Sequence, residues 1–155
     1  NAVLRTYGRH RRGPFLDSGA ATSHCRDLVD QFGVRTGPLD EPIAGLSGGN
    51  LQRLLVGREL VDGPRVVVAA QPTRGLDVQG VKAIQDLLVG ERDAGAAVLL
   101  ISEDLDELLT LADRLLVIHA GRIVAEFDPT TAERHAIGEA MVGHAVPADD
   151  QVANR

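Results

Sequence analysis

The sequence predicts an α/β fold with a mainly parallel sheet, because short apolar runs alternate with segments of helical spacing. The expected strands are rich in aliphatic and β-branched residues, and they cover residues 65–70, 97–101, 114–119 and 122–127. Helices are expected between them, over residues 79–94 and 105–112. Because parallel strands need long crossover connections, this alternation is typical of a parallel sheet flanked by helices.

The first fifty residues contain no convincing strand, so we expect a helical lobe attached to the sheet. Asp17 or Ser18 can cap a helix that ends near Phe32. Residues 34–43 hold two prolines and two acidic residues, which favours a loop.

Three regions follow from these elements. Residues 1–45 are expected to form the remainder of a helical subdomain, residues 46–143 the α/β core, and residues 144–155 a disordered tail. Within the core, further helices are expected over residues 47–60 and 129–142.

The composition excludes several kinds of function. The net charge of −6 argues against general nucleic-acid binding. The chain has no run of about 18 apolar residues that could span a membrane, and its single cysteine, Cys25, cannot form an internal disulfide. The histidines lack metal-ligand spacing, so no metal site is expected. The basic stretch 8–14 is expected to be a solvated loop, with contact to a partner or to lipid head groups as the alternative.

The segment Leu46-Ser47-Gly48-Gly49-Asn50 predicts a loop that faces a phosphate. Its two glycines let the backbone approach a ligand closely, and they lie at the start of an expected helix. The first amides of a helix have no partner within it, and the helix dipole favours an anion there. Ser47 can cap the helix or donate a hydrogen bond to a phosphate oxygen. Taken alone, the segment is equally compatible with a plain turn before a helix.

The apolar run Val66–Ala70 ends where a nucleotide hydrolase usually carries two carboxylates, but those places hold Ala70 and Gln71. In phosphoryl transfer, a carboxylate at such a strand end holds Mg²⁺, and a neighbouring glutamate polarises the attacking water. Alanine can do neither, and Gln71 can orient a water but cannot take its proton. The chain also has no Gly-x-x-x-x-Gly-Lys-Ser/Thr phosphate loop. One phosphate-facing surface is therefore preserved, while the catalytic strand end is degenerate.

Taken in order and at their spacing, Leu46–Asn50, the apolar strand and Pro72-Thr73-Arg74-Gly75-Leu76-Asp77 resemble the nucleotide-binding domain of ABC transporters. The chain is most similar to the C-terminal cassette of tandem-cassette importers for simple sugars and nucleosides. The resemblance extends to about Gly143. It implies a partial P-loop NTPase fold of the ABC-ATPase type, truncated at the N-terminus so that the Walker A part is missing.

The resemblance assigns a role to each matching position. Leu46, Ser47, Gly48, Gly49 and Asn50 match the signature motif, with Asn50 in place of the usual glutamine. Val66–Ala70 match Walker B, where Ala70 replaces the aspartate, and Gln71 occupies the catalytic glutamate position. Gly75, Leu76 and Asp77 match the D-loop, and Glu103 occupies the position of the switch histidine. No catalytic residue is intact, so we expect the chain's own nucleotide site not to hydrolyse ATP.

The resemblance also implies cofactors and partners. ATP and Mg²⁺ would be held mainly by residues outside this chain. Cassettes of this family pair head to tail, so the signature motif would complete the ATP site of a second cassette. Membrane permease subunits and, indirectly, an external solute-binding protein are the other implied partners. The expected function is ATP-driven import of a nucleoside or simple sugar, carried out peripherally at the cytoplasmic face of the cell membrane, with this chain inactive on its own.

Two other functions stay open at the level of sequence. The replacements at Ala70, Gln71 and Glu103 favour a non-hydrolytic regulatory cassette remnant, whereas the intact signature motif argues against it. A non-transport ABC protein that acts on DNA or ribosomes is disfavoured by the acidic charge and by the short closing segment. A permease gene beside the gene for this chain would favour the transport function over both of these alternatives.

Overall fold

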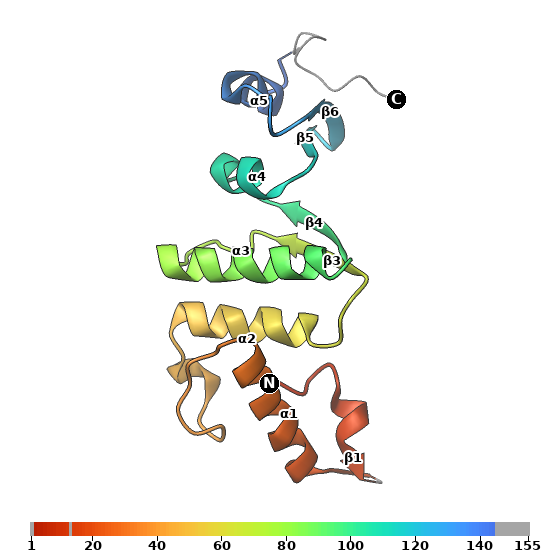
Figure 1. Ribbon diagram of the computed structural model, residues 1–155, viewed down its shortest axis with the longest axis vertical. Coiled ribbons are helices and arrows are strands. Elements are labelled where there is room, and N and C mark those ends of the chain that lie inside the picture. The colour runs from red at the N-terminus through yellow and green to blue at the C-terminus, as the bar shows by residue number, and fades with distance from the viewer. Residues whose placement is uncertain (1, 13, 145–155) are drawn as a thin grey trace. The chain divides into compact units, whose positions relative to one another are not determined.

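The computed structural model describes residues 2–12 and 14–144, and the chain divides into two compact units, Asn1–Leu99 and Leu100–Arg155 (Figure 1). The described part is a mixture of helices and short strands, as the sequence predicts. None of its helices is both long and apolar enough to cross a bilayer. The tail expected over residues 144–155 lies outside the described residues from residue 145 onward.

The first unit supplies most of the helices. Its elements are, in chain order, η1 (Tyr7–His10), β1 (Arg11–Arg12), β2 (Phe15–Leu16), α1 (Ser18–Gln31), η2 (Ile43–Gly45), α2 (Gly48–Leu60), β3 (Val66–Ala70) and α3 (Val78–Asp93). Strand β4 (Ala97–Ile101) begins in this unit and ends in the second, and it pairs with β3. Helix α2 packs against both α1 and α3. Asp17 caps α1, because its carboxylate accepts a hydrogen bond from Ala20 N at 3.0 Å.

An aliphatic core fixes the position of α2 in this unit. Leu28 and Phe32 from the α1 side are buried together with Leu54 and Leu60 of α2. Phe32, which follows α1, packs tightly against Gly57 of α2, where an added Cβ would lie 2.6 Å from Cγ of Phe32. This glycine is therefore needed for the packing of Phe32 against α2.

The second unit is a β-hairpin covered by a helix. It contains α4 (Leu105–Leu111), β5 (Leu115–His119), β6 (Arg122–Phe127) and α5 (Arg134–Met141). Strands β5 and β6 pair antiparallel across Ala120-Gly121, which both have positive φ, at 48° and 76°. Positive φ at both central residues is the mark of a type I′ turn, which matches the twist of a hairpin. Helix α5 packs on the hairpin, where Phe127 and Ile137 are buried.

Three features differ from the sequence-based expectation. The described strands form three two-stranded sheets and not one mainly parallel sheet, and the pairs β1–β2 and β5–β6 are antiparallel. The first fifty residues do contain strands, because β1 and β2 pair antiparallel, but each strand has only two residues and leaves no periodic signal. Helix α5 begins at Arg134 and not at Pro129. Asp128 accounts for the later start, because its carboxylate accepts hydrogen bonds from Thr130 N at 2.8 Å and from Thr130 Oγ1 at 2.6 Å, and these contacts hold a turn.

Candidate functional site

The segment Leu46–Asn50 forms the beginning of helix α2. Leu46 and Ser47 have extended backbones, and Ser47 is the residue that precedes the first helical residue, Gly48. The helical hydrogen bonding starts directly after Ser47, because Leu51 N donates to Ser47 O at 2.8 Å. The predicted start is thus confirmed to within one residue. Gly48 and Gly49 are the first helical residues, so their amides belong to the group that has no partner within the helix.

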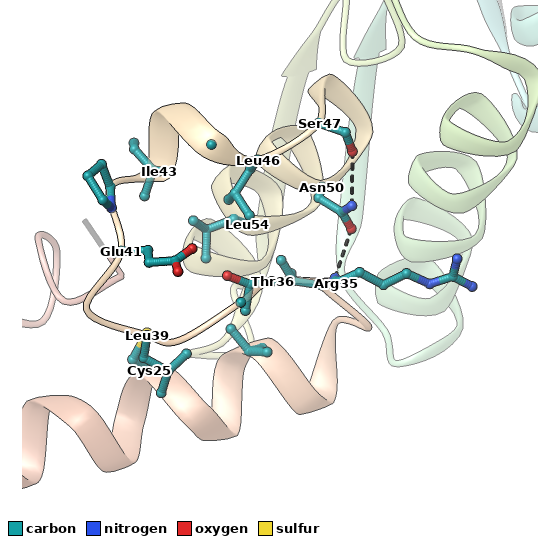
Figure 2. Close-up of a pocket in the computed structure, with 15 residues that line it drawn as sticks. Cys25, Arg35, Thr36, Leu39, Glu41, Ile43, Leu46, Ser47, Asn50 and Leu54 are labelled. Carbon is teal, nitrogen blue, oxygen red and sulfur yellow. Dashed lines mark hydrogen bonds between the residues drawn. The ribbon is translucent and has the colours of Figure 1, made fainter.

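The side chain of Asn50 stabilises this segment through two hydrogen bonds. Its Nδ2 donates to Ser47 Oγ at 2.9 Å, and its Oδ1 accepts from Arg35 N at 2.8 Å (Figure 2). Ser47 does not use its side chain to cap the helix, so that alternative is not the one the structure adopts. Because a hydroxyl that accepts one hydrogen bond keeps its own proton, Ser47 remains able to donate to a ligand.

Gly48 faces open space. It is exposed, and an added Cβ there would find no atom within 4 Å, whereas one on Gly49 would lie 3.9 Å from Cα of Gly80 in α3. Gly48 also lacks the positive φ that favours glycine. Neither packing nor backbone conformation within the chain therefore demands glycine at position 48. A requirement for glycine there would come from something that approaches the helix from outside.

The electrostatics at this helix start favour an anion. No acidic residue lies in the first turn of α2, so nothing in that turn neutralises the positive end of the helix dipole. A pocket of about 350 Å³ lies beside the segment and is lined by Leu46, Ser47 and Asn50 together with the preceding loop that contains Arg35 (Figure 2). The loop and Asn50 hold the exposed amides in place, which is the arrangement an anion-binding helix start requires.

The end of strand β3 lies close to this helix start. Gln52 Nε2, in the first turns of α2, donates to Pro72 O at 2.8 Å, and Pro72 is buried. Ala70 ends the strand, and Gln71 follows with a φ of 49°, a left-handed conformation that is uncommon for a residue with a side chain. The residue types at positions 70 and 71 offer a methyl group and a neutral amide where a magnesium site would need carboxylates.

The described residues contain no group of three or more His, Cys, Asp or Glu side chains that could hold a metal ion. At the end of β3, the methyl group of Ala70 offers no oxygen to the Mg²⁺ that the resemblance implies. The expectation of no metal site on this chain stays a prediction.

Gly75, Leu76 and Asp77 connect the strand end to α3. Gly75 has a φ of 76°, and Leu76 N donates to Thr73 O at 3.2 Å, so the segment forms a turn. Asp77 precedes the helix, and its carboxylate accepts a hydrogen bond from Gly80 N at 2.7 Å. The Asp77 carboxylate is thus a helix cap. The sequence analysis missed this role, although an aspartate directly before a helical pattern is a known start signal.

Glu103 lies in the second unit and is exposed. It precedes Asp104, whose carboxylate accepts from Asp106 N at 2.9 Å and from Glu107 N at 3.2 Å and so caps α4. The neighbouring Ser102 Oγ accepts from Asp104 N at 3.1 Å. Residues 102–104 therefore form a capped helix start at which Glu103 points a carboxylate into solvent.

Some hydrogen bonds that stabilise the site could not be predicted from the sequence. Arg35 takes part through its backbone amide, which any residue except proline would supply. Gln52 is visible beside the signature segment, but its partner is the carbonyl of Pro72, which carries no residue-specific signal.

Comparison with known proteins identifies relatives of the chain. No protein-family model matches it. It is 42% identical over 147 residues to a glucose import ATP-binding protein of Haloferax volcanii, 40% identical over 145 residues to a nucleoside import ATP-binding protein of Lactococcus lactis subsp. cremoris, and 41% identical over 145 residues to a guanosine import ATP-binding protein of Bacillus subtilis. Each match covers 92% of this chain but only 27%, 29% and 28% of the relative, respectively. The chain thus spans less than a third of the length of these curated relatives.

Solved structures share the fold. A metal-chelate type ABC transporter in an inward-facing conformation matches with a TM-score of 0.72 at 15% identity, covering 91% of this chain and 56% of that chain. A dimeric ATP-binding cassette in a post-hydrolysis state, bound to ADP and Pi, matches with a TM-score of 0.60 at 21% identity, covering 77% and 51%. At these identities the likeness shows the fold alone.

The relatives are import ATP-binding proteins, and the solved structures are ABC ATPases. The α/β class predicted from the sequence is confirmed as the ABC-ATPase form of the P-loop NTPase fold. The chain belongs to the ATP-binding cassette ATPases and is related to the sugar- and nucleoside-import ATP-binding proteins of that family.

Proposed function

We propose that the chain serves in the ATP-binding subunit of an ABC importer, in which ATP binding and hydrolysis drive the uptake of a nucleoside or a simple sugar. The glucose, nucleoside and guanosine import ATP-binding proteins among its relatives support this proposal. Because the chain spans less than a third of their length, the activity belongs to a larger assembly. The chain by itself is predicted to hydrolyse no ATP.

The single observation that carries this proposal is the open start of helix α2. In the proposed assembly, the amides of Gly48 and Gly49 and the hydroxyl of Ser47 bind the γ-phosphate of ATP held by a second cassette. The exposed Gly48, with no side chain or backbone within 4 Å of its Cβ position, leaves room for that ligand. The positive end of α2 then stabilises the negative charge of the phosphate. When bound, ATP supplies the phosphoryl group, while this chain binds and orients it.

The nucleotide site formed by the chain's own cassette is proposed to be inactive in hydrolysis. Ala70 supplies no oxygen for a metal ion, and Gln71 supplies no base. Glu103 would add negative charge at the position where the family places a histidine, which disfavours a phosphate there. Each of the three replacements disfavours hydrolysis at the chain's own site. The two nucleotide sites of the assembly would therefore differ in their rate of ATP hydrolysis.

The proposed partners are a second cassette, membrane permease subunits and, through the permease, an external solute-binding protein. Residues 1–45 are proposed to be the remainder of the helical subdomain that faces the permease, and residues 46–143 to be the ATPase core. The assembly would then work at the cytoplasmic face of the membrane, with this chain at its periphery. A cassette that regulates without hydrolysing is a second candidate, and the replacements at Ala70 and Gln71 favour it.

Uptake of labelled solutes tests the proposal. Cells that lack the intact ATP-binding protein are complemented with the wild type or with Gly48→Asp, and the uptake of nucleosides and simple sugars is measured. We expect the wild type to restore the uptake of one of these classes and Gly48→Asp to abolish it. Normal uptake with Gly48→Asp would contradict the role of the signature segment. Equal uptake with and without the protein would contradict the transport function.

A further inference from the structure

Two contacts join the beginning of helix α2 to the segment between β3 and α3, on the side where α2 lies beside α3 (Figure 1). The half-buried side chain of Gln52 donates from Nε2 to Pro72 O at 2.8 Å. A Cβ added to Gly49 would lie 3.9 Å from Cα of Gly80, which is an ordinary van der Waals distance. Van der Waals packing has little directional preference, so it resists sliding of the two helices only weakly. The hydrogen bond of Gln52 supplies a contact with a fixed direction and reach.

The backbone that Gln52 contacts has an uncommon conformation. Gln71, directly before Pro72, has a φ of 49°, which few residues with a side chain adopt. The residue before a proline also favours an extended backbone. Arg74 N donates to Gln71 O at 3.3 Å and closes a turn around the buried Pro72. Because such a conformation persists only where its surroundings hold it, the carbonyl of Pro72 is a well-defined attachment point for α2.

This attachment point lies one helical turn from the amides of the signature segment. Gln52 follows Gly48 by four residues and Gly49 by three, and residues at these spacings lie on the same side of a helix. A shift of α2 at Gln52 therefore moves both amides with it. Donors that stabilise developing charge act only when they are held at the right place, so the position of these amides matters for a bound phosphate.

We propose that Gln52 is a positioning residue for the ATP site of the second cassette. This inference rests on the function proposed above, in which the amides of Gly48 and Gly49 bind the γ-phosphate. Gln52 acts through its hydrogen bond to Pro72 O, which sets where the start of α2 lies relative to the end of β3. The alternative is that the side chain of Gln52 only fills space, and the two roles predict opposite results for two substitutions.

The first substitution is Gln52→Met in the intact assembly, tested by steady-state ATP turnover. Methionine has a similar length but no group that can donate to Pro72 O. We expect kcat to fall about 10-fold or more, because a small displacement of a preorganised group is costly in rate. The KM for ATP should stay within about twofold, since the interaction is made mainly in the transition state. One lost hydrogen bond leaves the protein folded, and thermal unfolding checks this.

The second substitution is Gln52→Lys, which restores a donor through Nζ. We expect its kcat to lie near the wild-type value and well above that of Gln52→Met. A side chain that only fills space would give the reverse order, because methionine packs better than a charged lysine. The matched control is Gln85 of α3, which is half-buried and has no side-chain hydrogen bond to another described residue. Gln85→Met and Gln85→Lys should both keep the wild-type kcat.

The outcomes separate this inference from the function on which it rests. A wild-type kcat in Gln52→Met would overturn the positioning role, and so would equal losses in Gln52→Met and Gln52→Lys. Gly48→Asp is measured in the same assay. Lost turnover with Gly48→Asp but not with Gln52→Met would reject the role of Gln52 and leave the proposed function standing. Unchanged turnover with Gly48→Asp would reject the proposed ATP site itself.

Discussion

The start of helix α2 and the end of strand β3 are neighbours in the first unit, yet they differ in what their residues can do. At the helix start, Ser47 and Gly48 are exposed, and Asn50 holds the segment in place. At the strand end, Gln52 holds the backbone at Pro72, but positions 70 and 71 offer no carboxylate. Hydrogen bonds support both backbones, so the two regions differ in side-chain chemistry.

If both assignments hold, this difference means that the two halves of a nucleotide site can change independently. A helix start binds phosphate through its backbone amides, which survive most substitutions elsewhere. A strand end that holds a metal and activates water depends on two particular side chains. On this basis we propose that the cassette hydrolyses no ATP at its own site and still presents its signature segment to its partner.

The largest expected effect is on hydrolysis at the chain's own site. In the intact assembly with the partner site disabled, we expect no ATP turnover, because Ala70 and Gln71 cannot hold a metal or activate water. The variant Ala70→Asp/Gln71→Glu/Glu103→His should gain turnover in a steady-state phosphate-release assay. Gln71→Glu alone is the control and should stay inactive. Turnover by the unaltered site would contradict the proposed inequality of the two regions.

The next effect contrasts two helical glycines, Gly57 in α2 and Gly90 in α3. Gly57→Ala places a Cβ against the ring of Phe32, and we expect it to destabilise the protein by about 1–3 kcal/mol. Gly90→Ala is the matched control, because its Cβ would meet no atom within 4 Å in α3, and it should stabilise by up to about 1 kcal/mol. Urea unfolding measures both variants. Equal changes in the free energy of unfolding would mean that α1 and α2 do not pack as described.

A smaller effect concerns the loop that follows the strand end. Asp77→Ala removes the cap of α3 and should cost about 1 kcal/mol of stability, whereas Asp77→Asn keeps an oxygen that can accept from Gly80 N. Thermal unfolding followed by circular dichroism distinguishes the two variants. If Asp77→Ala were as stable as the wild type, the carboxylate would be free for a role between cassettes and would not be used as a helix cap.

Much of the fold could be predicted from the sequence, because its elements follow regular patterns. The bounds of β4 and β6 match the expected ranges 97–101 and 122–127. Strands β1 and β2 could not be predicted, since two residues are too short to show a period.

At the candidate site, the sequence located the helix start and the strand end but not the contacts between them. The contacts Arg35 N to Asn50 and Gln52 to Pro72 O use backbone atoms, which residue identity does not specify. The left-handed conformation of Gln71 could not be predicted either, because that conformation favours glycine and position 71 holds none.

The measurement that tests the central claim most directly is ATP turnover by the intact assembly that carries Gly48→Asp. Gly48 has open space around it, so the substitution should leave the free energy of unfolding nearly unchanged. Gly90→Asp is the control, because it adds the same charge at another open helical glycine. The account predicts that turnover falls about 100-fold or more with Gly48→Asp and stays near the wild-type rate with Gly90→Asp, because the added carboxylate blocks and repels the phosphate at a site that stabilises charge. Unchanged turnover with Gly48→Asp would show that the start of α2 completes no ATP site, and the account would be contradicted.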